Sequence, residues 1–248
     1  MRPLPLTAAA VLSAAALAVP VAPALAAGHG HGHANTHAGH AKTHDHLAQQ
    51  ERGASHALAN QLRQVNRIAD RAATSERVSD VDRDGVSAEL QADSDALTAL
   101  ADQLAAATTH HDVVAAVHQG VLVRAVARTQ FTVAAQAGHV RSEADALTTA
   151  AQDLQTQVDA ATAAGQDTTA ATAALTDLAT QVTTASADAD AAIAAVVALG
   201  PDSTRPQVND ARDTAEAALA DAETALEAAT LDQSTVETAV AGFTAPTP

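Results

Sequence analysis

The stretch "VAAQAGHVRSEADALTTAAQDLQTQVDAA", residues 133–161, determines the fold class. Small and aliphatic residues recur along it at alternating intervals of four and three, the spacing of an apolar seam on one face of a packed helix. The seam consists of Val133, Ala137, Val140, Ala144, Leu147, Ala151, Leu154, Val158 and Ala161. Because alanine, the strongest helix former, fills many positions between them, the stretch predicts a long helix packed along most of its length.

Upstream of this stretch the apolar seam changes phase. Between residue 112 and residue 131 the expected seam is Val114, Val117, Val121, Arg124, Arg128 and Phe131. We therefore expect one helix from about Asp112 to Ala163 whose two halves pack against different neighbours. Gly120 and Gly138 argue against its continuity, since glycine costs about 1 kcal/mol relative to alanine in a helix.

Four further seams of the same kind flank the long helix. They predict helices over residues 47–74, about 86–107, about 171–199 and 208–229, separated by "SERVSD" (75–80), "TTH" (108–110), "GQDTT" (165–169) and "GPDSTRP" (200–206). Glycine and proline in the last segment predict that Gly200 caps the preceding helix. Short connections imply antiparallel neighbours.

The sequence therefore predicts an all-α fold, an elongated antiparallel helical bundle. We expect two three-helix bundles that share the long central helix, an architecture like that of spectrin-type repeats. The first bundle would cover residues 47–135 and the second residues 136–231, with a C-terminal tail over 232–248. One compact five-helix bundle with a kink at Gly138 is the alternative.

The N-terminal 26 residues have the composition of a secretory signal peptide. Arg2 is followed by an alanine-rich apolar stretch and by the small residues Ala24-Leu25-Ala26, which suit signal peptidase. Pro20 and Pro23 make the stretch a poor membrane span. We expect a secreted protein, extracellular or loosely associated with the cell surface, with no transmembrane anchor after cleavage.

Charge and composition exclude several classes of function. The formal net charge of −16 argues against nucleic acid and anionic membranes, which require a basic surface. The chain has no cysteine, tryptophan or tyrosine and only two phenylalanines. It therefore has no disulfides and few of the aromatic side chains that line sugar and cofactor sites.

Residues 27–46, expected to be a disordered tail, contain the main concentration of metal-binding atoms. Within "GHGHGHANTHAGHAKTHDH" (28–46) seven of the twelve histidines occur, His29, His31, His33, His37, His40, His44 and His46. Imidazole binds Cu(II), Ni(II) and Zn(II), and glycine spacers would let several histidines converge. The alternative is a low-complexity linker whose histidines bind nothing.

Cleavage after Ala26 would create a sharper metal site. The mature chain would begin Ala27-Gly28-His29, in which the amine, two backbone amides and the imidazole form a square-planar four-nitrogen site. That geometry selects Cu(II) or Ni(II) over Zn(II). The amides must lose protons, so binding would strengthen as pH rises.

Other polar motifs favour structural roles. Asp80, Asp82, Asp84 and Gly85 match the start of a calcium loop, but Gln91 replaces its final glutamate. We therefore interpret Ser79 or Asp80 as the cap of a helix with acidic residues in its first turn.

Further along that helix, Asp93 interrupts a leucine seam. Hairpin register places Asp93 near Arg124 or Arg128, which predicts a partly buried ion pair. The remaining histidines, His56, His110, His111, His118 and His139, are expected to be exposed or to cap helices. No arrangement of nucleophile and base is evident, so the sequence predicts no enzyme.

The stretch "VNRIADRAATSERVSDVDRDGVSAELQADSDALTALADQL" (65–104) comprises a helix, a turn and a leucine-rich helix with an internal aspartate. In this organisation, over about residues 57–230, the chain resembles uncharacterised secreted alanine-rich helical proteins of actinobacteria. Those relatives carry aromatic residues near the start of the long helix, where this chain has "VHQGVLVRAV" (117–126). The resemblance implies no activity.

These observations lead to two hypotheses of function. The first is a secreted, non-enzymatic helical protein whose histidine-rich tail binds transition metal ions as a buffer, scavenger or sensor, with no required cofactor. The second is a structural or interaction rod at the cell surface, with cell-surface or protein partners. The oligomeric state is left open by the sequence.

Overall fold

The structure, a computed structural model, describes residues 36–243, which form five helices. These are α1 (Thr36–Thr74), α2 (Asp80–Ala105), α3 (His110–Ala163), α4 (Thr169–Val197) and α5 (Arg205–Gly242). No strand occurs within this range, so the predicted all-α class is confirmed. Nor does any helix in the range combine the length and apolarity needed to cross a membrane.

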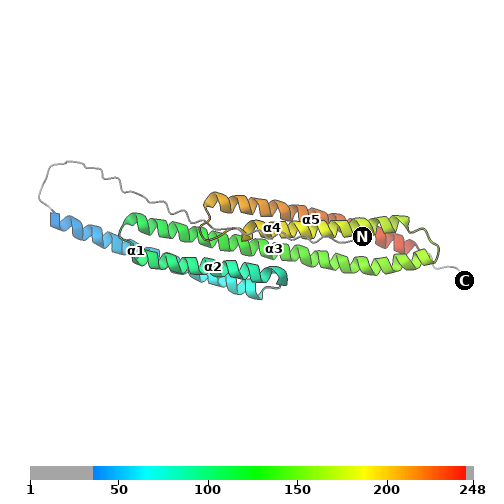
Figure 1. The fold of residues 1–248 in the computed structure, drawn as a ribbon, viewed down its shortest axis with the longest axis horizontal. Helices are drawn as coiled ribbons and strands as arrows, with labels where there is room; N and C mark the ends of the chain where they lie inside the picture. Colours follow the sequence, from blue (N-terminus) through cyan, green and yellow to red (C-terminus); the bar gives the residue numbers. More distant parts are fainter. Residues whose placement is uncertain (1–35, 244–248) are drawn as a thin grey trace, which may run out of the picture.

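Helix α3 is the axis of the molecule. It runs without interruption for 54 residues, about 80 Å at a rise of ~1.5 Å per residue. Helices α1 and α2 pack beside its first part and α4 and α5 beside its second part (Figure 1). Each helix is antiparallel to the next along the chain, as the short connections predicted.

The two helical hairpins overlap along the middle of α3. The α4–α5 turn lies beside the first half of α3, where Gln119 Nε2 donates to the carbonyl of Pro201 at 2.6 Å and Gln130 Nε2 to that of Leu199 at 3.1 Å. The α1–α2 turn lies beside the second half, against Gly138. Both hairpins therefore contact α3 between residues 119 and 141, and Figure 1 shows that they overlap along the middle of this helix.

The hydrophobic core follows this division of α3. One cluster joins α1, α2 and the first part of α3 and is rich in leucine, including Leu58, Leu90, Leu97 and Leu104. A second joins α3, α4 and α5 and consists mainly of alanine and valine. The first extends along α3 to Ala134 and the second begins at Val133, close to the seam change expected near Phe131.

The two glycines that argued against a continuous α3 are points of close approach. A Cβ at Gly120 would overlap Gln61 and Leu58 of α1, and one at Gly138 would overlap the backbone carbonyl of Arg77. The loss of helix propensity at each glycine is therefore offset by contact with a neighbouring segment. Where a kink was considered as an alternative, α3 continues through Gly138 as one helix.

The seam expected for the first half of α3 is wrong in part: Val117 and Phe131 pack against the leucine-rich cluster, but other members do not. Val114 is 51% exposed and Arg128 is exposed. The buried face instead comprises Val113, Ala116, Gly120, Val123 and Ala127. The prediction failed because aliphatic residues lie on every side of the helix here, so that more than one seam fits the sequence. In addition, the overlap of the two hairpins buries Leu122 and Val126 on a second face of α3.

Two helix boundaries and one helix cap also differ from expectation. Helix α1 begins at Thr36, well before Leu47, so residues 36–46 are helical rather than disordered. Helix α5 continues to Gly242, and its Val236 is buried in a third cluster with Leu154 and Leu175. Gly200 does not adopt a left-handed cap. Among the described residues only Gly165 has a positive φ, of 78°.

Candidate functional site

The predicted metal ligands fall at the N-terminal end of the chain. Ala27, Gly28, His29, His31 and His33 lie outside the described residues, as does the predicted signal peptide. His37, His40, His44 and His46 lie in the first part of α1, of which the structure describes the backbone course but not the side chains.

This part of α1 extends beyond the ends of its neighbours (Figure 1). Helix α3 begins beside Gln50 of α1, where His110 Nδ1 and Gln50 Oε1 form a hydrogen bond of 2.8 Å. Residues 36–46 come before Gln50 in α1, so this part of the helix extends away from the bundle (Figure 1).

The rest of the described chain offers no comparable concentration of ligands. Among residues whose side chains are described, no three histidine, aspartate or glutamate side chains are placed to hold a metal ion. His56, His110, His111, His118 and His139 are all exposed, as predicted. His139 Nε2 lies 3.2 Å from Glu143 Oε1, one helical turn away.

The aspartate-rich segment forms a helix start. Ser79 is the N-cap of α2: its Oγ accepts from the Asp82 backbone N–H at 3.4 Å and donates to Asp82 Oδ2 at 2.6 Å. Asp80 and Asp82 occupy the first turn, where the helix dipole favours negative charge. The predicted cap is confirmed, and no calcium loop forms because these residues are helical.

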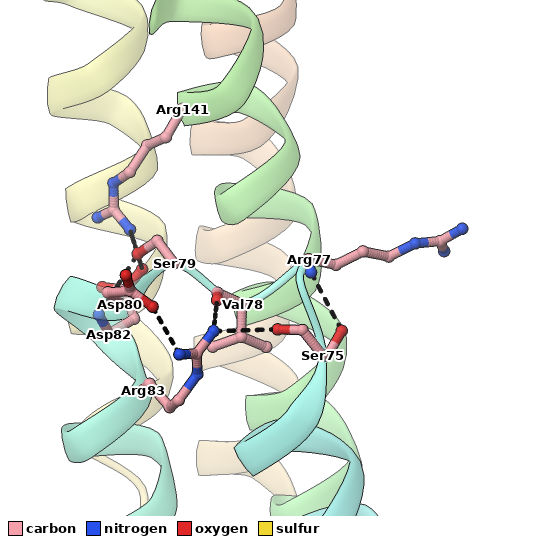
Figure 2. Close-up of polar contacts among 8 residues, drawn as sticks. All are labelled: Ser75, Arg77, Val78, Ser79, Asp80, Asp82, Arg83 and Arg141. Carbon is pink, nitrogen blue, oxygen red and sulfur yellow. Dashed lines mark hydrogen bonds and ion pairs between the residues drawn. The ribbon is translucent and has the colours of Figure 1, made fainter.

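Arg141 makes a polar link between three helices, which the sequence did not reveal. Its guanidinium donates to Ser79 Oγ at 3.0 Å, to Asp82 Oδ2 in α2 and to Asp190 Oδ1 in α4. We call Ser79, Asp82, Arg141 and Asp190 the junction cluster. Figure 2 shows Arg141 reaching from α3 to the start of α2. The only feature of the sequence that could have pointed to Arg141 is its position directly after the seam residue Val140.

A second arginine stabilises the α1–α2 turn itself. Arg83 donates to the carbonyls of Ser75 at 3.2 Å and Val78 at 3.0 Å and pairs with Asp80 at 2.5 Å. Arg77, by contrast, points away from this group (Figure 2). The bonds of Arg83 stabilise the turn that packs on Gly138. We therefore interpret the charged side chains of Arg83 and Asp80 as structural.

The predicted ion pair of Asp93 does not form. Asp93 is 1% exposed and its Oδ2 has no hydrogen-bond partner. Arg124 instead donates to Gln64 Oε1 at 3.0 Å, and Arg128 is exposed. The pairing failed because it rested on the wrong face of α3.

The pKa of Asp93 is raised to about 7, mainly by burial and to a smaller extent by the negative charge of Glu89, one turn away. The leucine seam predicted that Asp93 is buried, but no feature of the sequence showed that it would lack a partner. A protonated carboxyl here is compatible with its apolar surroundings.

The class of protein is thus defined by its fold, an elongated all-α assembly around one long helix. No known family model matches the chain, and searches of curated proteins and of solved structures found no match either. The resemblance to secreted alanine-rich proteins of actinobacteria stays a prediction.

Proposed function

We propose that this is a secreted, non-enzymatic helical protein whose histidine-rich N-terminal segment binds Cu(II), Ni(II) or Zn(II). The observation that carries the proposal is the occurrence of seven of the twelve histidines within residues 28–46. Four of them, His37, His40, His44 and His46, lie on the part of α1 that extends beyond the bundle (Figure 1).

Two binding modes follow from the two parts of the segment. His37, His40 and His44 are separated by three and four residues on α1, the spacing that places positions on one helix face. Imidazole suits all three metals. After cleavage behind Ala26, Ala27, Gly28 and His29 would supply the square-planar site for Cu(II) or Ni(II).

The finer architecture belongs to the same proposal. We interpret the overlapping hairpins as two three-helix bundles sharing α3, in the manner of spectrin-type repeats. Contacts of α3 with all four other helices support this interpretation. The unbroken length of α3 also favours a second candidate function, a rod that spaces partners at the cell surface.

The test is metal titration of the full mature chain. Cu(II), Ni(II) and Zn(II) are titrated separately, with competing chelators, against the native chain and a variant in which the seven histidines of residues 28–46 become asparagine. We expect the variant to bind at least tenfold more weakly. The matched control replaces the five exposed histidines (56, 110, 111, 118 and 139) and should bind as the native chain does.

Two partial variants separate the modes. Replacing His29, His31 and His33 tests the N-terminal site, and replacing His37, His40 and His44 tests the helical face. Mass spectrometry of secreted protein gives the cleavage position, and an extra N-terminal residue should weaken Cu(II) binding if the amine is a ligand. Equal metal affinity of the seven-histidine variant and the control would refute the proposal.

The biological alternative is tested in cells. If the seven-histidine variant leaves cellular metal handling unchanged while loss of the whole protein alters surface properties, the rod is the better interpretation. Metal analysis of protein purified without a metal column provides an independent measure.

A further inference from the structure

A groove between α1 and α3 combines three arginines with an apolar floor. It has a volume of about 370 Å³ and is lined by Gln64, Arg67, Ile68 and Arg71 of α1 and by Arg128, Phe131 and Thr132 of α3. We call it the arginine groove. We propose that the arginine groove binds a phosphate group, a site distinct from the N-terminal metal-binding segment.

The groove arginines lack acidic partners in a strongly acidic chain. The chain has 29 acidic residues against 13 basic ones, and Arg83, Arg141 and Arg212 are all ion-paired. Within the described residues, the side chains of Arg71 and Arg128 form no ion pair or hydrogen bond, and the side chain of Arg67 donates only to the carbonyl of Arg63, at 3.3 Å. Their guanidinium donors are thus available to a ligand.

Positive charge is concentrated around the groove at a cost in stability. Arg63, Arg67 and Arg71 follow one another at intervals of four on α1, as do Arg124 and Arg128 on α3. Like charges at this spacing repel one another and destabilise a helix. A bound anion would relieve this repulsion, so the groove is suited to a ligand of opposite charge.

The chemistry of the lining favours phosphate over carboxylate. The guanidinium fork matches both oxyanions, but a phosphate monoester carries about −1.5 to −2 charge at pH 7 and so neutralises more of the three arginines. Gln64 and Thr132 add polar groups, while Ile68 and Phe131 offer apolar contact to an organic substituent. The ligand class is therefore inorganic phosphate or the phosphate of an ester.

The probes are inorganic phosphate and pyrophosphate, titrated into full-length, EDTA-treated protein by phosphorus NMR and by thermal unfolding, with chloride at matched ionic strength as reference. We expect saturable binding and a higher melting temperature. The triple variant Arg67→Gln, Arg71→Gln, Arg128→Gln should weaken binding at least tenfold and retain the native circular dichroism spectrum, because its side chains form no ion pair.

Arg205→Gln is the matched control, since Arg205 begins α5, where a helix N-terminus could itself attract anions. Binding that is unchanged in this variant and lost in the triple variant supports the proposal. No saturable binding, an equal effect of chloride, or equal loss in both variants would overturn it. Vesicles of phosphatidylcholine with and without phosphatidic acid, compared with free phosphate, then show whether a lipid headgroup or a soluble phosphate is the better source.

Discussion

At the residue scale, Asp93 is the clearest departure from a purely apolar seam. Burying an ionised carboxylate without a partner is costly, so the side chain keeps its proton instead. With Leu90 and Leu97 on either side and no partner for Oδ2, the folded state favours the neutral acid. Asp93 therefore couples folding to pH even though it takes part in no site.

Asp93 should make stability fall as pH rises between about 4 and 7. In that window the unfolded chain has lost the Asp93 proton while the folded chain, whose Asp93 pKa is about 7, retains it. A shift of this size corresponds to roughly 4 kcal/mol. Asp93→Asn should abolish this slope and be more stable than the native chain above pH 7, measured by urea unfolding at several pH values.

The exposed Asp102 supplies the control for this prediction. Asp102→Asn removes an equal charge from the same helix but from its solvent face, and should leave the pH slope unchanged. If Asp93→Asn and the native chain show parallel stability curves from pH 4 to 8, Asp93 is not protonated in the folded state.

At the element scale, α3 shows how a helix accommodates residues of low propensity. Gly120 and Gly138 lower the helix propensity of α3, yet at each of them the missing side chain lets a neighbouring segment pack directly against the backbone of α3. The N-terminal end of α3, by contrast, is fixed by side-chain caps. Thr109 and Asp112 form a capping box, and the bonds from Thr109 hold the pKa of Asp112 below its usual range.

A pair of glycine substitutions separates propensity from packing. Gly138→Ala places a Cβ against the backbone carbonyl of Arg77 and should lower the free energy of unfolding by about 1–3 kcal/mol, despite the gain in helix propensity. Gly85→Ala in α2 meets no atom within 4 Å and should raise it by about 0.5–1 kcal/mol. Urea unfolding measures both, and stabilisation by both would mean that the turn does not pack on Gly138.

The contrast between the two halves of α3 explains what the sequence could predict. From Val133 onward alanine and polar residues separate the aliphatic ones, so a single seam fits and the predicted contacts with α4 and α5 are correct. Before Val133, aliphatic residues lie on several faces, and only tertiary structure selects one. The junction cluster was missed for a related reason: the sequence predicted that α2 and α3 are neighbours, but nothing local to Arg141 indicates that its side chain bonds to Asp82 and also to Asp190 of α4.

At the scale of the whole molecule, the two hairpins are joined by more than the shared helix. The α1–α2 turn, whose Val78 belongs to the leucine-rich cluster, contacts α3 at Gly138, and Ile193 of α4 packs against both clusters. Arg141 is the polar centre of this overlap, with a side chain only 17% exposed. We therefore expect the described helices to unfold as one cooperative unit.

Arg141→Met should weaken that cooperativity. The substitution leaves the Asp82 carboxylate, 6% exposed in the folded chain, without its cation, and removing one partner of a buried pair costs about 3–5 kcal/mol. Asp190, whose side chain is 71% exposed, contributes much less, so Asp190→Asn should cost under about 1 kcal/mol. In calorimetry the native chain should show one transition with equal van't Hoff and calorimetric enthalpies, and Arg141→Met a broader or split one. A sharp single transition in Arg141→Met would mean that the continuous α3 and its apolar contacts alone couple the two hairpins.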